Sequence, residues 1–140
     1  LSVPAVAILA PRASAATPEV YNEGGIAVDG SDVVAYFTKS KPVAGDASIT
    51  HDYMGVTWRF SSEENSDLFV ADPEAYAPQY GGYCAYAVSQ GYTASTVPEA
   101  WSIVDDKLYL NFSTSVRRRW DRDIPGHIIA ANANWPGVLS

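Results

Sequence analysis

The sequence predicts an α+β fold, in which a small antiparallel sheet made of hairpins has helices packed around it. Two stretches, residues 49–60 and 101–112, alternate apolar and polar side chains on both sides of a short turn, which is typical of hairpins. Segments with helix start and stop signals lie between the hairpins and after the second one. Strands grouped in hairpins favour α+β over a parallel α/β fold.

Length and composition are those of a single globular domain. The chain has 140 residues, of which 47% are hydrophobic and 12% aromatic, so we expect one sizeable core rich in aromatic side chains. The net charge of -7 repels phosphate backbones and anionic lipid surfaces and suits cations better. This balance argues against a nucleic-acid partner.

The first residues predict the remnant of a secretory signal peptide. An apolar stretch, Val3 to Ala10, precedes Ala13-Ser14-Ala15, which has small residues at both positions that a signal peptidase reads. The stretch is too short to span a bilayer, and an Ala-rich flexible tail is the alternative. The chain begins without Met or a basic region, so we expect it to be trimmed upstream. We expect an exported protein, periplasmic or extracellular, with a remnant at 1–15, an N-terminal extension at 16–24 and one domain at 25–136.

The region before the first hairpin combines turns and apolar runs. Asn22 to Gly25 is typical of a turn, and the apolar runs Ile26–Val28 and Val33–Phe37 are separated by the turn formers of residues 29–32. Lys39 to Asp46 is rich in Pro and Gly and predicts a loop.

The first hairpin is predicted at Ile49 to Phe60, with Met54-Gly55 at its turn. A helix should follow, because Ser61 and Glu64 have capping-box spacing, and Asp72-Pro73 should end it. We expect residues 73–80 to add a further helical turn.

The second hairpin is predicted from Trp101–Val104 and Leu108–Phe112, with two aspartates near its turn. Ser113 or Thr114 can cap a helix over residues 116–121. A last helix is expected at residues 126–134.

The segment around the single cysteine, Cys84, is the most unusual in the chain. A diglycine precedes the thiol and aromatic rings surround it, so the segment predicts a ligand pocket whose residues are Tyr80, Gly81, Gly82, Tyr83 and Tyr86. Thiolate is a soft ligand that Cu(I) prefers and that Zn also accepts. The alternative is a cysteine packed as a small hydrophobic residue in an aromatic core.

A lone thiol restricts the options further. One cysteine forms no intramolecular disulfide, and outside the cytoplasm a thiol is open to oxidation unless it is buried, bound to a metal or paired with another molecule. His51, in the middle of a predicted strand, is the candidate second metal ligand, with a structural or merely exposed histidine as the alternative. A homodimer joined through two copies of Cys84 stays open.

Signals for catalysis are weak. Cys84 and His51 would need an orienting group, for which Asp32 and Asp52 are unspecific candidates, and an oxyanion site. The sequence contains no nucleophile elbow, zinc-protease motif or phosphate-binding glycine loop. We therefore expect a binding protein and not an enzyme, with a thiol redox protein as an alternative.

Five blocks of the sequence stand out together, at residues 25–37, 53–62, 72–86, 101–111 and 120–135. In this order, the blocks resemble YHS-domain proteins of the bacterial exported type. The resemblance implies a compact α+β domain. It also implies a metal-binding or metal-sensing role in which cysteines are the suspected ligands.

The sequence departs from the cysteine-rich members of that group. No thiol follows the first hairpin in Phe60 to Asn65, so a site with several thiolates from one chain is excluded. We expect binding of a soft metal, copper before zinc, with Cys84 as anchor and His51 as second ligand. A metal-free module for a small ligand or a protein partner, with a structural cysteine, is the alternative.

Overall fold

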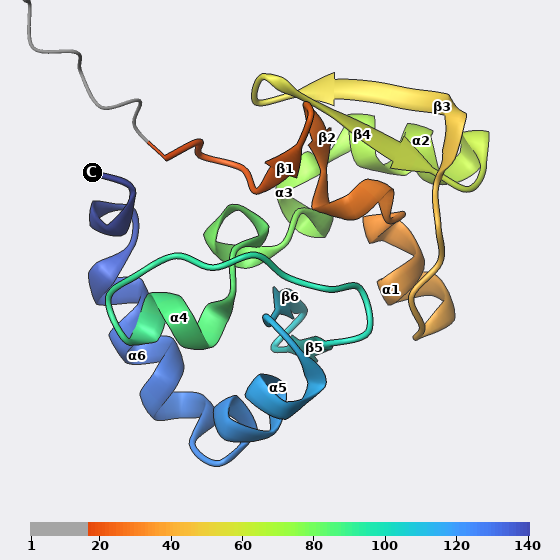
Figure 1. Cartoon of the computed structure of the whole chain (residues 1–140). Helices are drawn as coiled ribbons and strands as arrows, with labels where there is room; N and C mark the ends of the chain where they lie inside the picture. The colour runs from red at the N-terminus through yellow and green to blue at the C-terminus, as the bar shows by residue number, and fades with distance from the viewer. Residues whose placement is uncertain (1–16) are drawn as a thin grey trace, which may run out of the picture.

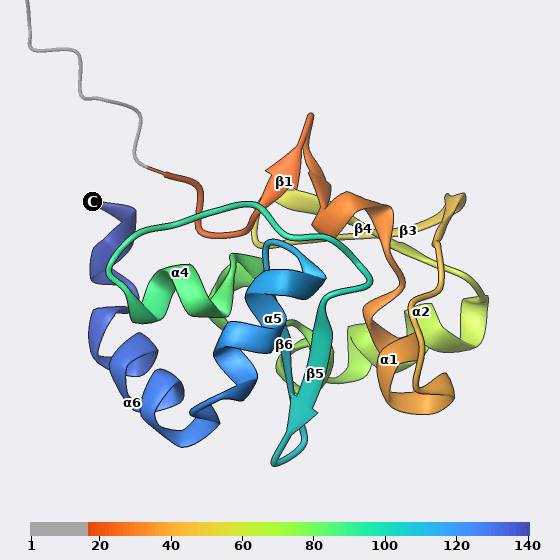
Figure 2. The same ribbon diagram turned by 60° about the horizontal axis from the view of Figure 1, so that its bottom comes forward.

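The computed structural model describes residues 17–140, which form an α+β fold, as the hairpins predicted (Figures 1 and 2). The strands are β1 (Asn22–Glu23), β2 (Ile26–Ala27), β3 (Asp46–Tyr53), β4 (Val56–Phe60), β5 (Trp101–Val104) and β6 (Lys107–Leu110). The helices are α1 (Val33–Lys39), α2 (Glu63–Ala71), α3 (Pro73–Tyr76), α4 (Ala85–Ser89), α5 (Thr114–Asp121) and α6 (Ile124–Asn134). Three short 3-10 turns are η1 (Val28–Gly30), η2 (Gln79–Gly82) and η3 (Gly137–Leu139).

The strands form two sheets. The larger has the order β1-β2-β4-β3, and β5 pairs with β6 in the smaller. The sequence predicted antiparallel strands, and one pair in the larger sheet differs. Strands β2 and β4 run parallel, with Ile26 opposite Thr57. The chain passes through α1 and β3 before it reaches β4, which gives it the length to return in the same direction.

Both predicted hairpins are confirmed. Their turns are Met54-Gly55 and Asp105-Asp106, and all four residues have positive φ, between 51° and 80°. Tight hairpin turns of this type need positive φ at both central positions, which Gly and Asp tolerate well.

The helix after the first hairpin begins one residue later than the capping box predicted. Ser62 is the N-cap of α2, and its hydroxyl accepts a hydrogen bond from the N–H of Asn65 at 3.1 Å. Ser61 instead donates its hydroxyl to the carboxylate of Asp32. Tertiary structure thus decides which of two adjacent serines caps the helix.

The other helix starts follow their caps. Ser113 caps α5 by accepting from the N–H of Val116. Helix α6 begins two residues earlier than expected because Asp123 is its N-cap, which places Pro125 in the first turn, where no intrahelical N–H is needed.

A buried carboxylate joins three elements. Asp32 has no exposed surface and caps α1 through Oδ1, which accepts from the N–H groups of Val34 and Ala35. Its Oδ2 accepts from the N–H and hydroxyl of Ser61 and from Nδ2 of Asn65. The sequence analysis gave Asp32 as a candidate to orient His51. In the described structure, however, Asp32 accepts hydrogen bonds from the residues of α1, Ser61 and Asn65 and not from His51.

The core is aromatic, as the composition predicted. Phe69 of α2 packs against Trp58, Phe60 and Tyr53, with ring centroids 5.0–5.5 Å apart. Trp120 of α5 has no exposed surface and packs on Tyr109 of β6 at 5.1 Å.

The first described residues, which precede β1, pack against the rest of the domain. Val20 and Tyr21 are 2% and 8% exposed, and the N–H of Tyr21 donates to the carbonyl of Gly81 at 2.8 Å. The predicted signal remnant, 1–15, lies outside the described residues. No helix in residues 17–140 has the length and apolar character needed to cross a bilayer.

Candidate functional site

Cys84 is the N-cap of the short helix α4 and is 1% exposed. Its Sγ accepts from the N–H of Phe112 at 3.2 Å and from that of Ala87 at 3.5 Å. The thiol also lies 3.4 Å from Oδ1 of Asn111, to which it donates. The sulfur therefore has a complete set of partners within the protein.

Burial raises the pKa of the Cys84 thiol above its ordinary value, and the N–H groups of Ala87, Phe112 and Tyr86 oppose this shift only in part. The thiol form is therefore dominant near neutral pH. Because the thiolate is both the nucleophile and the metal ligand, this environment lowers reactivity toward electrophiles and metals.

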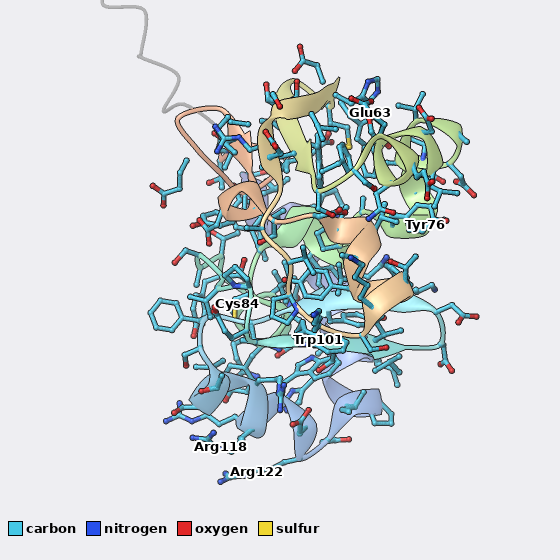
Figure 3. The ribbon with its side chains drawn as sticks, turned by 90° about the vertical axis from the view of Figure 1, so that its right-hand side faces the viewer. Glu63, Tyr76, Cys84, Trp101, Arg118 and Arg122 are labelled. Carbon is cyan, nitrogen blue, oxygen red and sulfur yellow. The ribbon has the colours of Figure 1, made fainter. Side chains whose placement is uncertain are left out.

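A small cavity of about 210 Å³ adjoins the sulfur, and we call it the thiol pocket. Its lining residues are Cys84, Tyr86, Ala87, Tyr92, Ala94, Phe112, Val116 and Arg119. Figure 3 shows Cys84 inside the fold, while Arg118 of the neighbouring helix α5 and Arg122, its C-cap, point outward to solvent. The pocket thus lies between α4, the segment that enters α5, and α5 itself.

His51 does not lie with Cys84. It is in β3 opposite Trp58, and its ring meets the edge of Phe69 with centroids 6.4 Å apart. Strand β3 and helix α4 lie on opposite sides of the molecule in both ribbon views (Figures 1 and 2). Among residues 17–140, no three His, Cys, Asp or Glu side chains lie close enough together to hold a metal ion.

The diglycine is required by the path of the chain itself. Gly81 has a φ of 62°, and a Cβ there would overlap the carbonyl oxygen of Glu19. A Cβ on Gly82, at a φ of 83°, would collide with the side chain of Val28. The close approach that two glycines predicted is therefore made by the N-terminal segment and by η1.

The predicted pocket residues separate into three places. Tyr86 lines the thiol pocket, whereas Tyr80 and Gly81 line a larger cleft. Gly82 and Tyr83 are buried and line neither, and the hydroxyl of Tyr83 donates to the carbonyl of Pro18 at 2.7 Å.

The larger cleft, which we call the aromatic cleft, has a volume of about 430 Å³. It lies between the β3–β4 turn, the α3–η2 segment and both ends of the described chain. The residues that line it are Glu19, Val20, Tyr53, Met54, Trp58, Glu74, Ala77, Pro78, Gln79, Tyr80, Gly81, Lys107 and Trp135.

Polar atoms of the rings in this cleft already form hydrogen bonds with other groups of the protein. Nε1 of Trp58 donates to the carbonyl of Tyr53 at 3.0 Å, and the hydroxyl of Tyr80 donates to Oδ1 of Asn132 at 2.9 Å. Burial raises the pKa of Tyr80 far above its ordinary value, so the phenol stays neutral. The rings therefore contribute mainly apolar surface.

Charge enters the cleft from two carboxylates and one ammonium. Glu19 and Glu74 are exposed, as is Lys107 beside the β5–β6 turn. Within residues 17–140, neither carboxylate takes part in an ion pair, so both are open to a ligand.

Most of the cleft escaped prediction from sequence. Glu19, Glu74, Lys107 and Trp135 are spread along the chain, and no local spacing connects them. The one available signal was the aromatic and glycine-rich segment at Tyr80, which supplies one wall.

Residues 34–80 match the family model of the YHS domain, so the resemblance to YHS-domain proteins is confirmed for this third of the chain, and the exported type stays a prediction. No curated protein and no solved structure matches the chain. The matched segment runs from α1 into η2 and includes Tyr53, Met54, Trp58 and Glu74 of the aromatic cleft. Cys84 lies beyond its end.

Proposed function

We propose that this chain, with its YHS-domain match at residues 34–80, is a binding protein that holds a small organic ligand in the aromatic cleft. The observation that carries the proposal is a cleft of about 430 Å³ lined by four aromatic side chains, of which Tyr53 and Trp135 are half-buried and Trp58 and Tyr80 are almost wholly buried. Ligand sites are typically concave and about 300–1,000 Å³ in volume, a range that includes this cleft. The described lining combines these rings with two carboxylates and one ammonium group, which are suited to orienting a bound ligand.

The chemistry of the lining favours a ligand with a flat apolar body and a positively charged group. Aromatic faces attract cations through their quadrupole. The two carboxylates, Glu19 and Glu74, outnumber the one ammonium, Lys107, and the net charge of -7 raises the local concentration of cations.

Phenethylamine, one ring with one ammonium group, is a suitable probe of the cleft. We expect it to quench tryptophan fluorescence saturably, because Trp135, which is only half-buried, lines the cleft. Replacing Glu74 with Gln should weaken binding by about threefold, since an exposed ion pair contributes about 0.2–1 kcal/mol.

The matched control is Glu63→Gln. Glu63 and Glu74 both lie in the first turn of a helix, but only Glu74 lines the cleft, and Figure 3 shows Glu63 pointing outward. The control should bind phenethylamine as the unmodified chain does. If both variants lost affinity equally, the loss would come from the change in net charge, and Glu74 would have no specific role in binding.

A soft metal, copper before zinc, held through Cys84 is the second candidate, and the YHS-domain match supports it. The described surroundings do not supply a second ligand, because the nearest polar groups are backbone N–H donors and the amide of Asn111. These N–H groups already donate hydrogen bonds to the sulfur. The described residues therefore fit a packed cysteine better than a metal anchor.

Titration with Cu(I) separates these two candidates. A metal held by Cys84 predicts that Cys84→Ser loses affinity by an order of magnitude or more, while the metal-free module predicts equal affinity in both chains. Non-reducing electrophoresis tests the homodimer joined through Cys84, which stays a prediction.

Burial and the raised pKa of Cys84 argue against the thiol redox alternative, since redox-active cysteines are exposed and have lowered pKa values. We also propose that the protein acts outside the cytoplasm, on the support of Ala13-Ser14-Ala15. Reduced and buried, the thiol is protected from oxidation in such a compartment.

A further inference from the structure

We propose that the thiol pocket is a second binding site, which takes a small apolar carboxylate whose anionic group meets Arg119. This site is separate from the aromatic cleft, since no residue lines both. The proposal therefore stands whether or not the cleft binds a ligand.

The pocket has an apolar entrance that the fold leaves open. Tyr92 and Phe112 line it, and they are 53% and 51% exposed, among the most exposed large hydrophobic side chains described. Ala87, Ala94 and Val116 add aliphatic surface. Exposed apolar surface beside a cavity is typical of a site that a ligand covers.

Charge selects the sign of the ligand. Arg119 is the only charged residue in the described lining, and it is exposed. Within residues 17–140 it has no side-chain hydrogen bond or ion pair, whereas Arg117 pairs with Asp121 and Arg118 donates to Ser115. A guanidinium group is well suited to a carboxylate, which it can bind through two parallel hydrogen bonds.

The floor of the pocket determines which end of the ligand enters first. The Cys84 sulfur already accepts from the N–H groups of Phe112 and Ala87, so these donors are not free for an anion. The thiol is neutral near neutral pH and repels no anion. The apolar end should therefore lie on the floor, with the carboxylate at the rim beside Arg119.

The volume limits the ligand to a small molecule. About 210 Å³ is below the range of drug-sized sites, roughly 300–1,000 Å³. Phenylacetate, with one ring and one carboxylate, is the probe we choose. Phenylacetamide is its neutral counterpart of nearly equal shape.

The experiment follows amide chemical shifts of the whole chain during titration with phenylacetate. We expect saturable shifts at Ala87, Ala94 and Phe112, and weaker binding of phenylacetamide. Arg119→Gln should weaken phenylacetate binding by about twofold to fivefold, the range for an ion pair at an exposed site.

Arg122→Gln is the matched control, because it removes the same charge at the C-cap of α5 but does not line the pocket. It should leave the affinity for phenylacetate unchanged. The proposal fails if these amides do not shift, if phenylacetamide binds as tightly as phenylacetate, or if both arginine variants lose affinity equally.

Discussion

Replacing Asp32 with Ala is expected to lower the free energy of unfolding by about 3–5 kcal/mol. The carboxylate is fully buried and accepts from the backbone of Val34, Ala35 and Ser61 and from two side chains. Each buried donor left without a partner costs about 1–3 kcal/mol. Loss of the cap should also loosen the start of α1.

Two further variants separate the carboxylate from its individual bonds. Asp32→Asn keeps one acceptor oxygen but turns an NH₂ group toward other donors, so it should give a smaller but still large loss. Ser61→Ala removes one hydroxyl donor and should cost only about 1 kcal/mol. Urea denaturation measures all three, and an Asp32→Ala chain as stable as the parent would contradict this account of the junction.

Gly81→Ala is expected to lower the free energy of unfolding by about 3 kcal/mol. The positive φ of 62° strains any side chain, and the added Cβ would meet backbone of the segment around Glu19, which cannot rotate away as a side chain can. The hydrogen bond from the Tyr21 N–H to the Gly81 carbonyl holds the two segments together. Displacing Glu19 should also weaken binding of phenethylamine in the aromatic cleft.

Gly91→Ala is the control for backbone strain alone. Gly91 has a φ of 94° but no atom within 4 Å of the position a Cβ would take. It should therefore cost only about 1 kcal/mol. Equal losses in thermal or urea unfolding would show that the crossing of Glu19 over Gly81 contributes nothing.

The hairpins could be predicted because their signals are local. Apolar and polar residues alternate on both sides of Met54-Gly55, which predicts β3 and β4. The two aspartates of the second turn mark the point where β5 ends and β6 begins. The parallel pairing of Ile26 with Thr57 could not be predicted, because it depends on tertiary packing between residues far apart in sequence. The choice of Ser62 over Ser61 as a cap depended on Asp32 in the same way.

The site was less predictable for a related reason. The sequence marked the Cys84 segment as unusual, but the groups that surround its sulfur come from Asn111 and Phe112, beyond β6. The predicted pair of Cys84 and His51 rested on ligand chemistry alone, and the fold places α4 and β3 apart. Both cavities are assembled from segments that share no local pattern.

The two cavities have opposite charge preferences, and this provides an internal control. Glu19 and Glu74 give the aromatic cleft a preference for cations, whereas Arg119 gives the thiol pocket a preference for anions. Phenethylamine and phenylacetate share a ring and differ in the sign of charge. Each probe therefore serves as the negative control for the other site.

An amide shift map recorded during titration with phenethylamine tests the central proposal most directly. Ligand binding in the aromatic cleft predicts saturable shifts grouped at Met54, Gln79, Gly81 and Trp135, with those at Cys84 unchanged. Shifts that do not saturate, or that scatter over acidic surface residues outside the cleft, would contradict it.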